Sequence, residues 1–338
     1  MNIIVLVCLF FATFLSMNGF GNEEVVNIYS FRKAELIKPL LTEFSKQTGI
    51  QANVVSGKAD KLMQRLIQDG DNSFADVLLT VDVARLEKAK QLGLIQPIQS
   101  KALLDNIPLA LRDPNNFWFG LSLRARAIFY AKNRADVSNI TSYEALLDKK
   151  WKGKICSRKG SHFYNQSMIA SFIYRYGEQW TQDWVSRFVK NLAERPNGGD
   201  RDQLRKLARG VCDLAIANSY YYGMLSASPK QSDRDAYQQV GIIFPVNQGV
   251  GTHVNVSGAA VTRAAKNKKN AVRFIEFLTT INAQHIYADT NYEYPIRADI
   301  SAAKLLTSWG ALKSDKGSVV ELTKYHEQAE RMIRSNKW

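Results

Sequence analysis

Short apolar runs alternate with amphipathic stretches over the first part of the chain, and this alternation constrains the fold more than any other feature. The runs VVNIYSF (25–31), IQANVVSG (50–57) and ADVLLTV (75–81) predict strands. Between successive runs, apolar residues recur at helical spacing, which predicts a helix in each gap. Strands that alternate with helices are typical of an α/β lobe with a largely parallel sheet.

The rest of the chain predicts a second unit of the same kind. At roughly 150 residues per domain, 338 residues suffice for two lobes with separate cores. The ligand site of such a protein is expected in the cleft between the lobes. We therefore predict an α/β protein of two lobes, with chain crossings near residues 119–123 and 255–259. Further strands are predicted at 117–132, 212–219 and 253–262, and helices at 142–149, 165–193 and 270–288.

The first 21 residues have the pattern of a secretory signal peptide. Residues 3–15 form an uncharged apolar run that is too short to cross a bilayer core about 30 Å thick. Gly19 and Gly21 follow where a cleavage site belongs, and we expect cleavage after Gly21. No Lys or Arg precedes the run, so an uncleaved anchor is the alternative.

Export would leave two cysteines, Cys156 and Cys212, in an oxidising compartment. We predict a single disulfide between them. Zinc is not expected, because two thiols need two further ligands and the four histidines show no metal-type spacing. The sequence contains no GxGxxG, Walker loop, HExxH or GxSxG motif, so it gives no support for an enzyme.

The net charge of +14, from 45 Lys and Arg against 31 Asp and Glu, favours an anionic partner or surface. A solvated basic surface that only confers solubility is the alternative. The basic residues are scattered along an exported chain, so a nucleic-acid partner is not expected.

Four tyrosines fall where a predicted strand gives way to a loop or helix: Tyr29, Tyr164, Tyr220 and Tyr221. Phenolates are hard anionic ligands, and a phenol with a pKa near 10 ionises at neutral pH only beside a strongly charged cation such as Fe(III). Tyrosines also pack in cores or line pockets for sugars and polyamines. The residues alone leave these alternatives open.

Seven segments resemble the periplasmic ferric-iron-binding proteins, the soluble receptors of iron ABC transporters. The resemblance runs from about residue 25 to the end and implies a periplasmic-binding-protein fold, Fe(III) in the interlobe cleft, and an inner-membrane ABC permease as partner. The segments are NIYSFR (27–32), FADVLLTVD (74–82), LRDPNNFWFGLSLRARAIFYAKNR (111–134), SHFYNQSMIAS (161–171), NGGDRDQL (197–204), GVCDLAIANSYYYG (210–223) and NYEYPI (291–296). We expect a signal peptide at 1–21, an N-terminal lobe at 22–118 plus 256–305, and a C-terminal lobe at 119–255 plus 306–338.

The resemblance implies a set of iron ligands. The family's adjacent tyrosine pair matches Tyr220 and Tyr221, the tyrosine of its FYN or PYN segment matches Tyr164, and the tyrosine after its first strand matches Tyr29. Tyr222 has no counterpart among the ligands and is expected to pack. Iron would then bridge Tyr29 on one lobe to the other three tyrosines on the other. The disulfide would tie together the strands that deliver three of the four ligands.

Two departures from the family leave the fifth and sixth coordination positions open. Some relatives have a His-Tyr pair where this chain has Lys33 and Ala34, and others have a carboxylate ligand where it has Val81 next to Asp82.

An anion such as carbonate, held by Arg32 and Asn218, would fill these positions, and water is the alternative. Arg124 and Arg126 are further candidates to offset the ligand charge. We expect a monomeric periplasmic binding protein without catalytic activity. A receptor for a polyamine or an anion in the same fold is the alternative.

Overall fold

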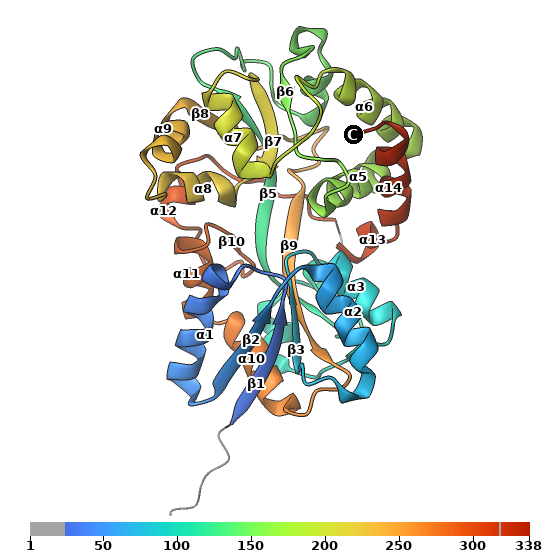
Figure 1. The fold of residues 1–338 in the computed structure, drawn as a ribbon, viewed down its shortest axis with the longest axis vertical. Coiled ribbons are helices and arrows are strands. Elements are labelled where there is room, and N and C mark those ends of the chain that lie inside the picture. Colours follow the sequence, from blue (N-terminus) through green and yellow to red (C-terminus); the bar gives the residue numbers. More distant parts are fainter. Residues whose placement is uncertain (1–23, 318) are drawn as a thin grey trace, which may run out of the picture.

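Ten strands form one sheet in the part of the chain that the computed structural model describes, residues 24–317 and 319–338 (Figure 1). The strand order is β2-β1-β3-β9-β5-β7-β6, with β4 paired to β9 and both β8 and β10 paired to β5. The predicted signal peptide, residues 1–21, lies outside the described residues. The strands are β1 (Val25–Ser30), β2 (Gln51–Ser56), β3 (Val77–Thr80), β4 (Ile95–Gln96), β5 (Phe119–Ala131), β6 (Ile155–Cys156), β7 (Leu214–Asn218), β8 (Val240–Ile243), β9 (Val254–Thr262) and β10 (Tyr294–Pro295).

Helices cover the sheet in two lobes, so the predicted two-lobed α/β architecture is confirmed (Figure 1). The first lobe contains α1 (Ala34–Thr48), α2 (Ala59–Asp69), α3 (Ala84–Gln91), α4 (Lys101–Asn106), α10 (Lys268–Leu278) and α11 (Ile281–Asp289). The second contains α5 (Phe163–Tyr176), α6 (Glu178–Lys190), α7 (Asp200–Ala208), α8 (Tyr220–Ser226), α9 (Gln231–Gln239) and α14 (His326–Ser335). Near the waist lie α12 (Lys304–Thr307) and α13 (Val319–Thr323). Single 3₁₀ turns occupy Gly70–Asn72 and Leu109–Leu111.

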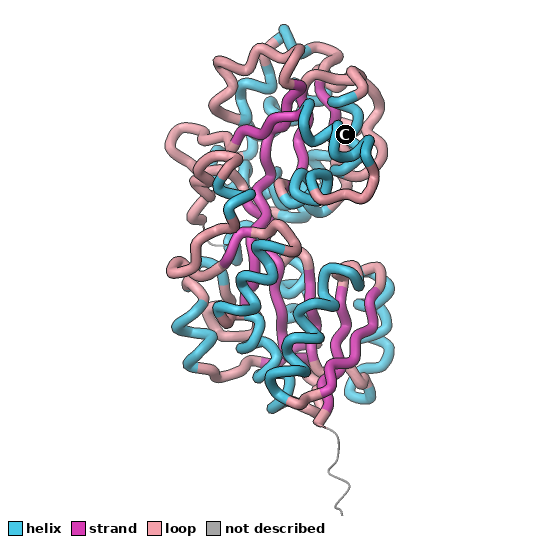
Figure 2. Tube along the Cα trace, turned by 90° about the vertical axis from the view of Figure 1, so that its left-hand side faces the viewer, coloured by secondary structure: helices cyan, strands magenta, loops and turns pink. Residues whose placement is uncertain are grey.

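The long strand β5 belongs to both lobes. Its first half, Phe119–Ala125, pairs with β9, and its second half pairs with β7 and β8 of the second lobe. Figure 2 shows strands continuing through the narrow waist between the lobes. The lobes are therefore joined by extended chain at the base of the cleft, and β5 changes partners between Ala125 and Arg126 rather than within the predicted 119–123.

Two predicted helices are each broken in two, and one is a different structure. Gly177, at φ 83°, separates α5 from α6, because a left-handed glycine ends a helix at little steric cost. Thr280 ends the expected helix at 270–288 and caps α11, its side chain accepting from the backbone N–H of Ala283. Residues 142–149 form 3₁₀ turns, Tyr143–Leu147 and Lys149–Trp151, rather than an α-helix.

Each lobe has its own apolar core. Phe44 and Phe274 lie in the core of the first lobe, and Trp184 and Phe188 lie in a core of the second. Val319 packs in the first-lobe core, although the expected boundaries assign residues 306–338 to the second lobe. The chain near residue 319 thus lies against both lobes, and the exact boundaries stay a prediction. None of the helices within the described residues has the length and apolarity needed to cross a bilayer.

Candidate functional site

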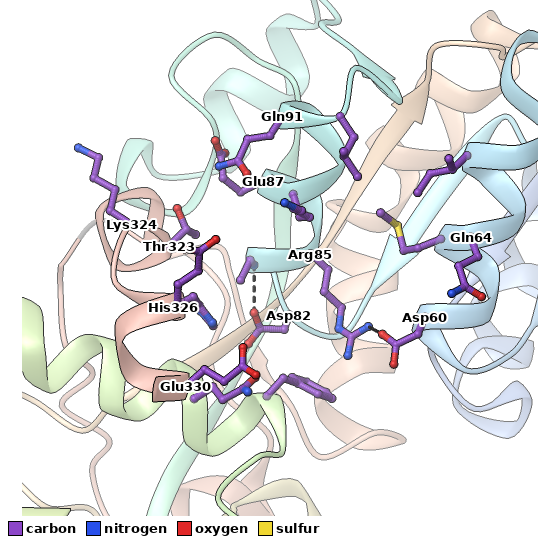
Figure 3. A pocket seen from close by; sticks show the side chains of 18 residues that line it. Asp60, Gln64, Asp82, Arg85, Glu87, Gln91, Thr323, Lys324, His326 and Glu330 are labelled. Atoms are coloured by element: carbon purple, nitrogen blue, oxygen red, sulfur yellow. Dashed lines mark hydrogen bonds and ion pairs between the residues drawn. The ribbon is translucent and has the colours of Figure 1, made fainter. Parts of the chain in front are cut away.

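A cavity of about 180 Å³ lies between the lobes, at the carboxyl ends of β1 and β7. The first lobe contributes Phe31, Arg32, Lys33, Leu36 and Val81. The second contributes His162, Phe163, Tyr164, Tyr220, Tyr221 and Met224, and Arg124 of β5 and Glu293 complete the wall. A second interlobe cavity, of about 610 Å³ and lined by α2, α3, α5 and α14, shares only Phe163 with the first (Figure 3). We call the smaller cavity the tyrosine pocket.

Tyr164 and Tyr220 meet at the centre of the tyrosine pocket. Tyr164 lies at the start of α5 and Tyr220 at the start of α8, and their phenol oxygens are 3.4 Å apart. Arg124 donates from Nη1 to the phenol oxygen of Tyr164 at 3.3 Å. The structure therefore brings two of the predicted ligands within the reach of one ion.

Tyr221 lies beside this pair, its ring centroid 4.0 Å from that of Tyr220. Burial, reinforced by the neighbouring Tyr164, raises the pKa of both Tyr220 and Tyr221 above the ordinary value. Both phenols are therefore neutral at pH 7 until a cation displaces the protons. Ser219, the residue before α8, does not cap the helix with its side chain, because its hydroxyl accepts from the backbone N–H of Ala125 on β5 at 3.1 Å.

Tyr222 packs, as the resemblance implied. Its hydroxyl donates to the carbonyl oxygen of Val240 at 2.6 Å, and its ring lies against Phe129 at 5.5 Å. Its phenol oxygen is engaged outside the tyrosine pocket.

Tyr29 does not join the other three tyrosines. It is fully buried in the first lobe, with its ring edge-on to Phe74 at 5.3 Å and the Arg65 guanidinium 5.6 Å from its centroid. Tyr29 precedes the last residue of β1, so its side chain points to one face of the sheet rather than beyond the strand's end. The predicted bridge from Tyr29 across the cleft is absent from this arrangement.

Three arginines surround the Tyr164 ring. The guanidinium carbons of Arg124, Arg126 and Arg158 lie 5.6, 5.9 and 5.4 Å from its centroid. Arg126 and Arg158 both bind the buried carboxylate of Asp200, at 2.6 and 3.3 Å. Burial would raise the pKa of Asp200, but these two arginines hold it below its ordinary value. One carboxylate offsets one of these three positive charges.

Asn218 lies beneath the tyrosine pocket rather than in its wall. Its amide oxygen accepts from Arg126 at 3.2 Å, and its backbone N–H donates to Asp200 at 2.9 Å. The expected contact between Asn218 and a pocket anion therefore has no support in the geometry, and Asn218 instead holds the arginine network in place.

Arg32 lines the first-lobe wall in a fixed position. It forms a buried ion pair with Glu293 and donates to the hydroxyl of Ser257 at 2.9 Å. Ser122 also donates to Glu293, and although burial raises the pKa of Glu293, Arg32 and Arg124 hold it below its ordinary value. Glu293 is the only carboxylate among the described residues that line the tyrosine pocket, and it is already bound.

His162 lines the pocket but is not placed to act as a ligand through Nδ1, which accepts from the backbone N–H of Tyr164 at 3.3 Å. Burial, with the positive charge of Arg158, lowers the pKa of His162 to about 3, so the ring is neutral. Within the described residues, no group of three or more His, Cys, Asp or Glu side chains is placed to hold a metal ion. A metal in the tyrosine pocket would therefore depend on phenolates.

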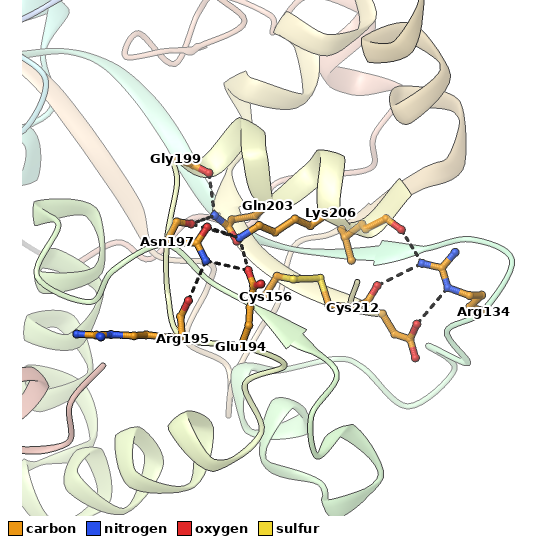
Figure 4. Close-up of a disulfide and its surroundings, with 11 residues drawn as sticks. Arg134, Cys156, Glu194, Arg195, Asn197, Gly199, Gln203, Lys206 and Cys212 are labelled. Atoms are coloured by element: carbon orange, nitrogen blue, oxygen red, sulfur yellow. Dashed lines mark hydrogen bonds and ion pairs between the residues drawn. A yellow bond between two sulfur atoms is a disulfide. The ribbon is translucent and has the colours of Figure 1, made fainter. Parts of the chain in front are cut away.

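The disulfide between Cys156 and Cys212 is confirmed, with a Cα–Cα distance of 5.8 Å (Figure 4). Cys156 ends β6 and Cys212 precedes β7, and these two strands pair in parallel. The chain leaves β6 toward Tyr164 and leaves β7 directly into Tyr220. The disulfide thus fixes the strands that position the tyrosines.

Reducing this disulfide is expected to lower the free energy of unfolding by roughly 2–4 kcal/mol, because the bridge constrains the unfolded chain. Denaturant unfolding of the mature protein with and without reductant measures the loss. Thiol labelling of denatured, unreduced protein should find no free thiol, and two labelled thiols would show that the bridge does not form.

Reasoning from sequence assigned no role to Arg158, Asp200 or Glu293. Asp200 and Glu293 lie inside the segments NGGDRDQL and NYEYPI, and Arg158 follows Cys156 closely. Buried charges are rare unless paired, but the pairing here joins residues from different elements, 42 positions apart for Arg158 and Asp200. The only sequence signal was that Asp200 and Glu293 lie in segments shared with the family, although the sequence showed no partner for either.

Comparison with known proteins gives consistent results. The family model described as "Bacterial extracellular solute-binding protein" matches residues 32–285. Iron uptake protein A1 of Synechocystis sp. is 42% identical over 318 residues, which cover 94% of this chain and 88% of that protein.

Two solved structures share the fold along their whole length. A Trichodesmium protein (IdiA, FutA) in complex with iron and citrate ligands superimposes with a TM-score of 0.88 at 41% identity, covering 93% of this chain and 99% of that one. Mannheimia haemolytica ferric iron-binding protein A in an open conformation superimposes with a TM-score of 0.86 at 40% identity, covering 93% and 98%.

Proposed function

This chain belongs to the bacterial extracellular solute-binding protein family, as a ferric-iron-binding receptor for ABC transport, and we propose that it binds Fe(III) through Tyr164, Tyr220 and Tyr221. The observation that carries this proposal is the convergence of these three phenols on one interlobe cavity. Three phenolates would neutralise the charge of Fe(III).

Three phenolates leave part of the coordination shell of iron to other groups. The opposite wall offers the cations Arg32 and Lys33, and its one carboxylate, Glu293, is bound to Arg32 and Ser122. An anion with hard oxygen atoms suits that wall. Carbonate or a carboxylate such as citrate would bind the iron and pair with these cations. Water is the competing occupant of the same coordination positions.

The positive wall also weighs against a polyamine as the ligand. Arg32, Lys33 and Arg124 line the tyrosine pocket, and a polycation would be repelled by all three. An anion receptor without iron remains the second candidate, and it predicts a colourless complex.

We expect the protein to function outside the cytoplasm, as a monomer that delivers iron to a membrane permease. The family match to extracellular solute-binding proteins supports this location, and the resemblance of the segments favours the periplasm after cleavage following Gly21. The reaction is binding and release, with no catalytic step and no nucleic-acid partner.

Absorption spectroscopy tests the proposed function directly. Titrating purified mature protein with ferric citrate should produce a visible phenolate-to-iron charge-transfer band that saturates at one iron per chain. Spermidine and citrate alone should produce no band. A titration with ferric citrate that stays colourless would favour the anion receptor.

A further inference from the structure

We propose that the second lobe carries a binding site for a small oxyanion with two or more negative charges, in a cavity outside the interlobe cleft. Of the described residues, only members of the second lobe line this cavity, whose volume is about 700 Å³. We call it the basic pocket. It shares no lining residue with the tyrosine pocket among the described residues, so this inference goes beyond the proposed function and depends on neither iron nor the distance between the lobes.

Positive charge dominates the basic pocket. Its lining includes four cations, Lys159, Arg195, Arg334 and Lys337. Glu330 is the only acidic side chain among the described residues that line it, and it is already paired with Arg334 at 3.0 Å. A free carboxylate on the last residue would offset only one more of these charges. Like charges held this close repel one another, and an anion that contacts several of them at once relieves the repulsion.

Three segments that are far apart in the sequence bring the cations together. Lys159 lies between β6 and α5, and Arg195 lies between α6 and α7. Arg334 and Lys337 lie at the end of α14. Figure 4 shows the Arg195 side chain extended away from the neighbouring Glu194, whose carboxylate pairs with a lysine of α7 instead. Arg195 is therefore free of the nearest acidic residue in its own segment.

Trp338 fixes the end of the chain beside Lys159. Its indole N–H donates to the hydroxyl of Ser157 at 3.1 Å, and its carbonyl oxygen accepts from the backbone N–H of Gly160 at 3.2 Å. A Cβ atom on Gly160 would lie 2.7 Å from the Trp338 ring, so glycine is needed for this close approach. Lys159 and Lys337 each adjoin one of these two residues, and their backbones are therefore held near each other.

The carboxyl end of α14 carries partial negative charge, which by itself would oppose an anion. The carbonyl oxygens of Ile333 and Arg334 are occupied, however, because they accept from the backbone N–H groups of Trp338 and Lys337 at 3.2 and 3.1 Å. This closure holds Lys337 at φ 58°, a left-handed conformation that lysine seldom adopts. The chain thus caps the helix itself and places a lysine at the pocket.

The lining of the basic pocket indicates the class of ligand. A concave site of several hundred Å³ is typical of a small molecule. Arginine guanidinium groups match the paired oxygens of phosphates and carboxylates, and lysines add point charges. Diphosphates and polycarboxylates have this chemistry. The net charge of +14 favoured an anionic partner, and the basic pocket is a place where part of that charge surrounds one cavity.

Isothermal titration calorimetry of iron-free mature protein with pyrophosphate tests this site. Wild-type protein should show a saturable site whose affinity falls as the salt concentration rises. The double variant Lys159→Gln/Lys337→Gln should bind at least tenfold more weakly at this site, because it removes two charge-assisted contacts. Arg195→Gln, on a separate segment, should weaken the binding roughly fivefold. Thermal melting should show that all variants are folded.

Lys149→Gln/Lys152→Gln is the matched control. Both lysines are exposed residues of the second lobe outside the basic pocket, and the double change removes the same amount of charge. This control should bind pyrophosphate like wild type. Titration with ferric citrate should give the same charge-transfer band in every variant, because none of the substituted residues lines the tyrosine pocket.

Three results would overturn the anion site. Wild-type protein could show no saturable binding, Lys159→Gln/Lys337→Gln could bind as tightly as wild type, or the control could lose affinity to the same extent. Vesicles of phosphatidylglycerol and phosphatidylcholine separate a soluble anion from a membrane: sedimentation with them that requires Lys159 and Lys337, without pyrophosphate binding, would identify a lipid surface instead. A colourless ferric titration would contradict the proposed function and leave the pyrophosphate result as it stands.

Discussion

Tyr220→Phe and Tyr221→Phe are each expected to weaken Fe(III) binding by more than about a hundredfold and to shift or abolish the visible band. Each change deletes one phenol oxygen and keeps the ring, whose packing at 4.0 Å from its neighbour is preserved. Changes to groups outside the ligand set of a metal site typically cost 10–100-fold in affinity, and loss of a ligand should cost more. Competition with a chelator and the absorption spectrum measure both effects.

Two neighbouring tyrosines serve as controls. Tyr222→Phe loses the hydrogen bond to Val240 and should lose about 1–1.5 kcal/mol of stability, with wild-type colour and affinity. Tyr29→Phe should also bind iron normally, because Tyr29 lies in the first-lobe core. Wild-type colour and affinity in both Tyr220→Phe and Tyr221→Phe would show that the proposed site is wrong. Loss of iron binding in Tyr29→Phe would instead support the arrangement predicted from the sequence, in which iron bridges Tyr29 to the second-lobe tyrosines.

Tyr29 was expected at the cleft but lies in the core of the first lobe. The reason is that a strand pattern does not show to which face each side chain points. Residues Ile28 to Ser30 are all buried, because β1 lies between β2 and β3 under helices. A strand buried on both faces has no polar alternation to show where each side chain points. Only the packing of α2 and Phe74 over one face places Tyr29 away from the cleft.

Tyr164 and Tyr220 could be placed because each begins a helix after a strand of the second lobe. The carboxyl ends of such strands meet at the cleft, so the order of strand and helix was enough to bring these residues together. The cysteines could be paired by elimination, since export leaves only two. The sequence therefore sufficed to predict the fold and the common cavity of three of the four tyrosines, whose role as ligands stays a prediction.

The arginines around Tyr164 could not be assigned their partners from the sequence. Arg124 and Arg126 lie on the same face of β5, two positions apart, yet they have different partners: Asp200 for Arg126, and Val81 with Tyr164 for Arg124. Such buried pairings depend on how α7 and β5 pack against each other, and the local sequence pattern does not predict this packing. The same holds for the contact between Asp82 and Ser167, which joins the two lobes across 85 positions of the chain.

Affinity for Fe(III) is expected to fall steeply as the pH drops. The pKa values of Tyr220 and Tyr221 are raised above the ordinary phenol value, so both residues carry protons at pH 6–8 in the iron-free protein and lose them when iron binds. Protons compete with the metal, so the apparent association constant should rise about tenfold per pH unit for each phenol that ionises. Tyr220 and Tyr221 together then change the apparent association constant by about a hundredfold per pH unit.

Proton release measured in weakly buffered solution checks this expectation. Adding a ferric chelate to wild-type protein should release at least two protons per iron after the release from the chelate itself is subtracted. Tyr220→Phe and Tyr221→Phe should each release one proton fewer and show a shallower dependence of affinity on pH, whereas Tyr222→Phe should match wild type. Equal proton release from all four proteins would mean that iron binds without ionising these phenols, and the colour would then have to come from another group.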